Sequence, residues 1–167
     1  MRSSFKSAWG LFAALVLVIA AGTPAWANTA DDDPDSEATT ATITAGDLAD
    51  PDHLITCKIN SFKPFKTGNV ITGLGTMSSC TPNRPETCRT EADLLRYYPE
   101  TGNWLVIANG NVSYQCPLPK ATSNAKFTCH PTSRNWSYMT RVYGTIVHDN
   151  RPKSRHLDSD VFNIKCV

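Results

Sequence analysis

The chain has 167 residues, 41% of them hydrophobic, and a formal net charge of +1. Only one apolar run approaches the length of a membrane span, which excludes a protein with several transmembrane helices. The length suits one domain of ordinary size. The small net charge is the sum of an acidic N-terminal region and a basic remainder.

Residues 1–27 have the three parts of a secretory signal peptide. Arg2 and Lys6 give a positive start, an apolar stretch follows, and Ala25 and Ala27 occupy the small-residue positions of a cleavage site. Because the apolar stretch is short for a stable span, we expect cleavage after Ala27, no stable membrane insertion afterwards, and a secreted, extracellular protein. An uncleaved N-terminal anchor is the alternative.

Residues 28–52 hold eight acidic residues and neither Lys nor Arg. Such a segment buries too little apolar surface to offset the entropy of ordering it, so we predict an acidic, disordered lead-in. A pro-segment that covers the basic remainder is the alternative. Residues 53–167 hold 14 basic and 7 acidic residues, a net charge of +7, and form the predicted folded domain.

From residue 53 onward, apolar residues alternate with polar ones, as in strands with one solvated face. The alternation is clearest in LITCKIN, VSYQC, KFTCH and VFNIKC. Two longer runs, NVITGLGTMSS and RNWSYMTRVYGTIVH, carry glycines that mark bends or close neighbours. NWLVIAN is apolar on both faces, which predicts a central strand with Trp104 in the core. TEADLLRYYP allows a helical turn, but its two tyrosines favour a strand.

Turn-forming residues separate these runs. The predicted turns are KPFKTGN, PETGN, NGN, PLPKATSN, PTSRN and HDNRPKSRHLDSD. The Asn109–Gly110 pair gives the best two-residue hairpin signal. About seven or eight short strands with no long helical pattern between them predict an all-β fold, an antiparallel, immunoglobulin-like β-sandwich with disulfides.

Six cysteines in an exported chain predict three disulfides. Four of them lie in phase with the apolar residues of their strands and are expected to point inward, whereas Cys80 and Cys88 bracket a proline-rich turn. Pairing these two with each other would close a short loop around Arg84. Sequential pairing is preferred, because it crosses no connections: Cys57–Cys80, Cys88–Cys116 and Cys129–Cys166.

One function that the sequence allows is that of a secreted protease inhibitor that presents residues 80–88 or 149–158 to an exported protease. It is the alternative to a binding or structural role. A substrate-like loop needs a cleavable bond after its specificity residue. Arg84 is followed by Pro85, whose ring fixes the backbone and removes the N–H group. A rigid turn between strands is therefore the preferred interpretation of CTPNRPETC.

No catalytic residue, metal site or cofactor is predicted. The chain has no G-x-S-x-G or H-E-x-x-H motif and no C-x2-C pair, and its cysteines are expected to be oxidised. His148 falls in a polar turn, where a solvated histidine is the preferred interpretation. Asp158 and Asp160 are interpreted as turn residues rather than as cation ligands.

Basic side chains lie beside aromatic ones toward the C-terminus, an arrangement that can bind an anionic extracellular polymer. The alternative is that the aromatic residues belong to the core and that the charges keep the protein soluble. The predicted binding residues are Arg134, Trp136, Arg141, Arg151, Lys153 and Arg155.

Three stretches, NVITGLGTMSSC, WSYMTRVYGTIV and the terminal FNIKC, resemble those of small secreted immunoglobulin-like β-sandwich proteins of actinobacteria with no assigned activity. The resemblance implies an exported domain and transfers no catalytic residue. The six cysteines and the acidic segment go beyond it. We therefore expect a secreted, non-catalytic protein that binds an extracellular polymer or protein, or that has a structural role.

Overall fold

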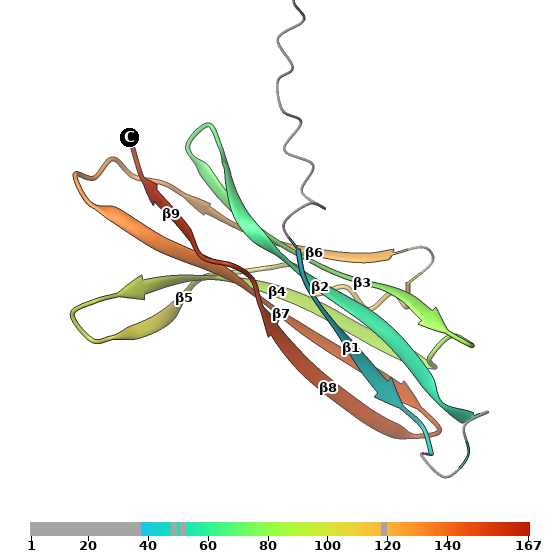
Figure 1. Cartoon of the computed structure of the whole chain (residues 1–167). Helices are drawn as coiled ribbons and strands as arrows, with labels where there is room; N and C mark the ends of the chain where they lie inside the picture. Colours follow the sequence, from blue (N-terminus) through green and yellow to red (C-terminus); the bar gives the residue numbers. More distant parts are fainter. Residues whose placement is uncertain (1–37, 48–49, 51–52, 118–119) are drawn as a thin grey trace, which may run out of the picture. The chain divides into compact units, whose positions relative to one another are not determined.

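The structure is a computed structural model that describes residues 38–47, 50, 53–117 and 120–167. The predicted signal peptide and residues 28–37 lie outside the described residues. The structure has two antiparallel sheets and three disulfide cross-links, which confirms the predicted all-β sandwich (Figure 1). The described strands are β1 Ala38–Ala45, β2 Ile55–Thr67, β3 Val70–Thr81, β4 Thr87–Tyr98, β5 Asn103–Asn109, β6 Lys120–Thr128, β7 Asn135–His148, β8 Arg151–Asp158 and β9 Phe162–Lys165.

The strands divide into a four-stranded and a five-stranded sheet. Sheet A has the order β1-β2-β3-β6, and sheet B has the order β5-β4-β7-β8, with β9 pairing with the start of β7. Two-residue turns join β2 to β3 and β7 to β8. Both residues of the second turn, Asp149 and Asn150, have positive φ angles of 52° and 56°, as in the hairpin turn that matches strand twist. Within the described part of the chain, no helix has the length and apolar character needed to cross a bilayer.

The core lies between the sheets and has two clusters of buried residues. Between the clusters, the backbone of β3 comes close to the side chains of β7. The clusters form because alternate residues of each strand face inward. Gly75 of β3 faces Val142 of β7, and a Cβ atom added at Gly75 would lie 2.3 Å from Val142 Cγ2. One cluster includes Ile43, Ile59, Met77 and Ile146, and the other includes Ile71, Leu94 and Tyr138.

The prediction that residues 28–52 are disordered is wrong for Ala38–Ala45. These residues form β1 and pair with β2 along its first half. Composition hid the strand, because the acidic residues flank it and it contains none of them. Within it, Ala41, Ile43 and Ala45 face the core and the threonines between them face outward, which is the alternation expected of a strand with one solvated face.

NWLVIAN is a strand, but it is not central. It forms β5, which pairs only with β4 and is therefore an edge of sheet B. Leu105 and Val106 are 49% and 45% exposed. Trp104 is half-buried against Tyr97, with their ring centroids 5.3 Å apart. The apolar character of this run reflects packing at an edge rather than burial on both faces.

Several predicted turns and strands also differ from the structure. Most of HDNRPKSRHLDSD forms β8, so only its Asp149–Asn150 pair is a tight turn. PLPKATSN enters β6 at Lys120, and KPFKTGN continues β2 as far as Thr67. VSYQC forms only an isolated bridge to β4, and no hairpin forms at Asn109–Gly110. The polar composition of β8 and β6 hid them, because residues 151–156 of β8 are exposed on both faces and alternate residues of β6 are exposed.

Sequential disulfide pairing is confirmed: Cys57–Cys80, Cys88–Cys116 and Cys129–Cys166. The first joins neighbouring strands of sheet A, whereas the third joins the end of β6 to the end of β9 and so connects the two sheets. Cys88 is buried in the first core cluster, and Cys116 packs against that cluster, although it lies in an irregular segment rather than in the predicted strand. Three disulfides are typical of proteins that fold in an oxidising, extracellular environment.

Candidate functional site

The six predicted binding residues do not form one cluster. Trp136 lies at the start of β7, whereas Arg151 pairs with His148 at the end of that strand. At about 3.3 Å per residue, these positions are about 40 Å apart. Four of the five predicted basic residues are also held by other groups of the protein, which lowers the charge they offer to a ligand.

Arg134 and Trp136 belong to a cation–aromatic cluster at one end of the sandwich. The guanidinium carbons of Arg134 and Arg96 lie 4.4 and 4.5 Å from the Trp136 ring centroid. Arg134 also forms an ion pair with Glu100, and this hydrogen bond lowers the pKa of the Glu100 carboxyl group. Burial raises the pKa of the neighbouring Tyr138. The cluster therefore ties the β4–β5 turn to β7 and leaves Arg134 neutralised.

Arg141 is neutralised within sheet B. Its Nε and Nη2 atoms donate to the two carboxylate oxygens of Asp158 at 2.7 and 2.8 Å. This two-pronged bond raises the pKa of Arg141 and keeps the side chain in place on the outer face of β7 and β8. Arg141 is thus a cross-strand partner of Asp158 rather than a free cation.

Arg151 and Arg155 contact the N-terminal part of the described chain, across the seam where β8, an edge of sheet B, lies beside β1, an edge of sheet A (Figure 1). Arg151 forms an ion pair with Asp47 at 3.3 Å, and Arg155 Nη1 donates to the carbonyl oxygen of Thr42 at 2.9 Å. Lys153 is exposed between them. Charged side chains on an edge strand also prevent pairing with other chains. Arg151 and Arg155 thus connect the edge of sheet B to the edge of sheet A.

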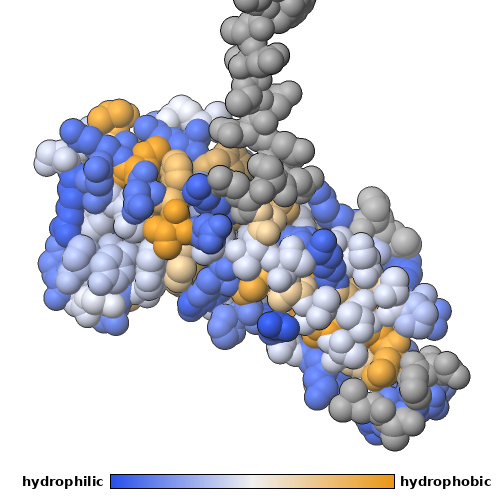
Figure 2. Space-filling view, in the orientation of Figure 1, coloured by the Kyte–Doolittle hydropathy of each residue, from blue (hydrophilic) through white to orange (hydrophobic). Residues whose placement is uncertain are grey.

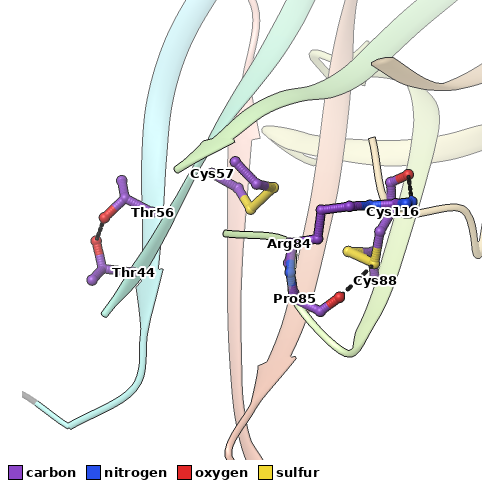
Figure 3. The surroundings of a disulfide bond; sticks show 8 residues. Thr44, Thr56, Cys57, Arg84, Pro85, Cys88 and Cys116 are labelled. Carbon is purple, nitrogen blue, oxygen red and sulfur yellow. Dashed lines mark hydrogen bonds between the residues drawn. A yellow bond between two sulfur atoms is a disulfide. The ribbon is translucent and has the colours of Figure 1, made fainter. Parts of the chain in front are cut away.

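In the turn between β3 and β4, the Arg84 side chain is hydrogen-bonded to the domain. Arg84 Nη2 donates to the carbonyl oxygen of Cys116 at 3.2 Å, so the side chain lies along the domain (Figure 3). Pro85 is buried. Because Cys80 and Cys88 pair with other cysteines, residues 80–88 are not a loop closed by their own disulfide.

The outer face of sheet A carries threonines and lysines in rows across the strands. One row runs Thr42, Lys58, Ser78 and Lys120, as the register of β1, β2, β3 and β6 shows. The next row is made of hydroxyl and amide groups, and a third lysine lies farther along β6. We call this set the lysine–threonine face: Thr40, Thr42, Thr44, Thr56, Lys58, Asn60, Ser78, Lys120, Thr122 and Lys126. Thr76, which lies in the row of Asn60, is buried and is not part of it.

Hydrogen bonds hold the polar side chains of this face in place. Thr40 Oγ1 donates to Asn60 Oδ1 at 3.0 Å, and Asn60 Nδ2 donates to Thr76 Oγ1 at 3.0 Å. Thr44 and Thr56 share a hydrogen bond of 2.9 Å (Figure 3). Cross-strand pairs of this kind stabilise a sheet and fix the positions of its surface groups. A ligand would therefore meet an ordered polar surface.

Sheet A is positively charged and contains no acidic residue. Its four strands hold five lysines and neither Asp nor Glu. Lys58, Lys120 and Lys126 are exposed, and none of them forms an ion pair with a residue that the structure describes. The acidic residues of the described strands lie in β4 and β8 of sheet B. The sequence analysis missed this face, because its lysines come from β2 and β6 and three of its threonines, Thr40, Thr42 and Thr44, from the segment predicted to be disordered.

Sheet B has a shallow cleft of about 500 Å³ on its outer face. Arg89, Glu91, Asp93, Tyr143 and His156 line it, and Arg89 pairs with Glu91 while Asn109 donates to Asp93 at 3.2 Å. Its charges therefore compensate one another. In the view of Figure 2, hydrophobic residues form only small, separate patches among polar ones. Neither the cleft nor the hydrophobic patches indicate a class of ligand as clearly as Lys58, Lys120 and Lys126 of sheet A do.

Comparison with known proteins supplies no relative from which a function could be inferred. No protein-family model, no curated protein and no solved structure matches the chain. The functional argument consequently depends on the residues of this chain and on their arrangement.

Proposed function

We propose that this chain is a secreted, non-catalytic β-sandwich protein that binds an anionic extracellular polysaccharide through the lysine–threonine face. The observation that carries the proposal is the absence of acidic residues from the four strands of sheet A, beside Lys58, Lys120 and Lys126, which are exposed and form no ion pair with a described residue. A surface with cations and no anions attracts a polyanion over its whole area, because no like charge opposes the approach.

The uncharged groups of the face favour a polysaccharide over a nucleic acid. Hydroxyl and amide groups of Thr40, Asn60 and Thr122 can exchange hydrogen bonds with sugar hydroxyls along the row between the lysines. Proteins that bind single-stranded nucleic acids stack successive bases on several aromatic side chains, whereas Phe65, in the row of Lys126, is the one exposed aromatic residue in the strands of sheet A. A carboxylated or phosphorylated glycan fits both the charge and the hydrogen-bonding groups.

Export is part of the proposal. Residues 1–27 have the sequence features of a signal peptide, and three disulfides support folding in an oxidising compartment. The resemblance to immunoglobulin-like exported proteins remains a hypothesis. In this chain β2 and β3 are neighbours in one sheet, whereas the second and third strands of an immunoglobulin constant domain lie in different sheets.

Replacing Lys58, Lys120 and Lys126 together by alanine is expected to weaken binding to alginate, a carboxylated polysaccharide, about 100-fold at low salt. The estimate takes about 1 kcal/mol for each basic residue at an anionic surface. Binding is measured by affinity electrophoresis at several salt concentrations, and that of the unmodified protein should weaken as the salt concentration rises.

The triple variant R151A/K153A/R155A is the matched control, because it removes the same charge from the β1–β8 seam. We expect it to bind alginate within about twofold of the unmodified protein, since two of its arginines are already engaged. Circular dichroism checks that both variants are folded. Equal weakening by the two variants would reject the lysine–threonine face as the binding site.

The protease-inhibitor hypothesis has less support. The Arg84 guanidinium group is bonded to the carbonyl of Cys116, and residues 151–158 are the strand β8 rather than an extended loop. Inhibition would be recognised by loss of trypsin-like activity on addition of an equimolar amount of this protein.

A further inference from the structure

Three chain segments meet at the end of the sandwich that carries the β7–β8 turn, and each brings a side chain that can bind a metal. Glu86 precedes β4, His148 ends β7 and Asp149 begins the turn. The ligand atoms of these three residues lie within 4.8 Å of one another. His53, just before β2, approaches the same aspartate. The sequence analysis predicted no metal site, because these residues are far apart along the chain.

The distances in this cluster fit a shared ion better than hydrogen bonds. His148 Nε2 and His53 Nδ1 each lie 3.7 Å from Asp149 Oδ2, which is too long for a hydrogen bond between nitrogen and oxygen. Ligands at 2.0–2.2 Å from a tetrahedral zinc ion are about 3.4 Å apart. The ligand atoms of Glu86, His148 and Asp149 are therefore close enough to one another to share an ion, and His53 approaches the cluster through Asp149.

The backbone positions two of the ligands without an ion. The Glu86 N–H group donates to the carbonyl of Val147 at 2.9 Å, and the Asp149 N–H group donates to Glu86 Oε1 at 3.0 Å. The other carboxylate oxygen of Glu86 remains for a ligand. Sites whose ligands are already in place bind a metal with a smaller ordering cost.

His148 supplies an independent observation. Its side chain is only 18% exposed, yet Nδ1 is buried without a hydrogen-bond partner among the described residues, and Nε2 is beyond hydrogen-bond distance of Asp149. A buried imidazole nitrogen without a hydrogen-bond partner is unusual in a native protein. The other nitrogen, Nε2, is the one that faces Asp149, and it is available to a ligand in the cluster.

We propose that Glu86, His148, Asp149 and His53 form a zinc site. Imidazole nitrogen together with carboxylate oxygen is a donor set that zinc accepts, whereas calcium and magnesium prefer oxygen ligands alone. The described cysteines all form disulfides and do not compete for the metal. The ion would join the start of β2, the β3–β4 connection and the β7–β8 turn, and so would tie sheet A to sheet B. This site is separate from the lysine–threonine face and does not depend on polysaccharide binding.

Zinc binding to the disulfide-bonded protein tests the proposal. Isothermal titration with zinc chloride should show one site, and zinc at 100 times its Kd should raise the Tm by roughly 10 °C. Calcium and magnesium at the same concentrations should leave the Tm unchanged. A Tm that does not respond to zinc, together with no saturable heat of binding, would overturn the proposal.

Variants locate the site. H148Q, E86Q and D149N should each weaken zinc binding at least tenfold, and D149N is the cleanest of them because asparagine also adopts the positive φ that this turn requires. H130Q removes an exposed histidine outside the cluster and should leave the Kd unchanged. Equal binding by D149N and the unmodified protein would refute the site. The same tenfold loss is expected for H53Q, and an unchanged Kd there would remove His53 from the ligand set.

Discussion

Replacing Cys129 and Cys166 by alanine is expected to lower the free energy of unfolding by about 4 kcal/mol, the largest effect of any change considered for this protein. This disulfide closes the longest loop, with a sequence separation of 37, so its loss releases the most conformational entropy in the unfolded chain. It also joins the end of β6 in sheet A to the end of β9 in sheet B. Urea unfolding followed by tryptophan fluorescence measures the loss.

C57A/C80A serves as the comparison, because that disulfide joins neighbouring strands within sheet A. Its separation of 23 gives an expected loss of about 3.4 kcal/mol. Only C129A/C166A should alter the near-ultraviolet circular dichroism of the second core cluster, where the Tyr138 hydroxyl lies 3.7 Å from Cys166 Sγ. A loss below about 1 kcal/mol for C129A/C166A would show that the two sheets hold together without this connection.

Gly75→Ala is expected to destabilise the protein by about 3 kcal/mol, which is large for the addition of one methyl group. The new Cβ would lie 2.3 Å from Val142 Cγ2 and 2.9 Å from Val142 Cγ1. Relief requires the two sheets to separate or Val142 to leave its rotamer, and both disturb packing between the two core clusters. The measurement is the midpoint of urea unfolding at an unchanged m-value.

Two further variants separate crowding from other effects of the added methyl group. Gly102→Ala places a methyl group where nothing lies within 4 Å, although the φ of +68° there makes a cost of about 1 kcal/mol expected. The double variant G75A/V142A should be more stable than the sum of the single effects predicts, by about 1 kcal/mol or more, because Val142→Ala removes the atoms that clash. Strict additivity would show that Gly75 matters for a reason other than its contact with Val142.

The fold class was predictable from the sequence, and the sequence favoured the disulfide pairing that the structure has. Alternation was visible in β2, at the end of β6 and in β9, because their apolar residues share one face, whereas the equally alternating VSYQC forms only an isolated bridge. Sequential pairing of the cysteines followed from the requirement that connections do not cross. Both features depend on residues that are close in the sequence or on the order of elements along it.

Edge strands were predicted less well. The basic strand β8 was taken for a turn and the threonine-rich β1 for part of a disordered segment, because a strand at the edge of a sheet needs fewer apolar residues. β5 was apolar enough to suggest a central strand and is an edge instead. Position within a sheet is decided by which strands pair, and local composition does not determine pairing.

Which charged side chains remain without an ion-pair partner depends on the three-dimensional fold. Arg134, Arg141 and Arg151 find acidic partners 34, 17 and 104 residues away in the chain, respectively at Glu100, Asp158 and Asp47. Lys58 and Lys120 form no ion pair with a residue that the structure describes, and they share a row only because β3 pairs with both β2 and β6. The net charge of a segment is a property of its sequence, but the charge that a ligand meets depends on which side chains the fold pairs. That difference arises because ion pairs form through space, between groups whose separation along the chain carries no information about their distance.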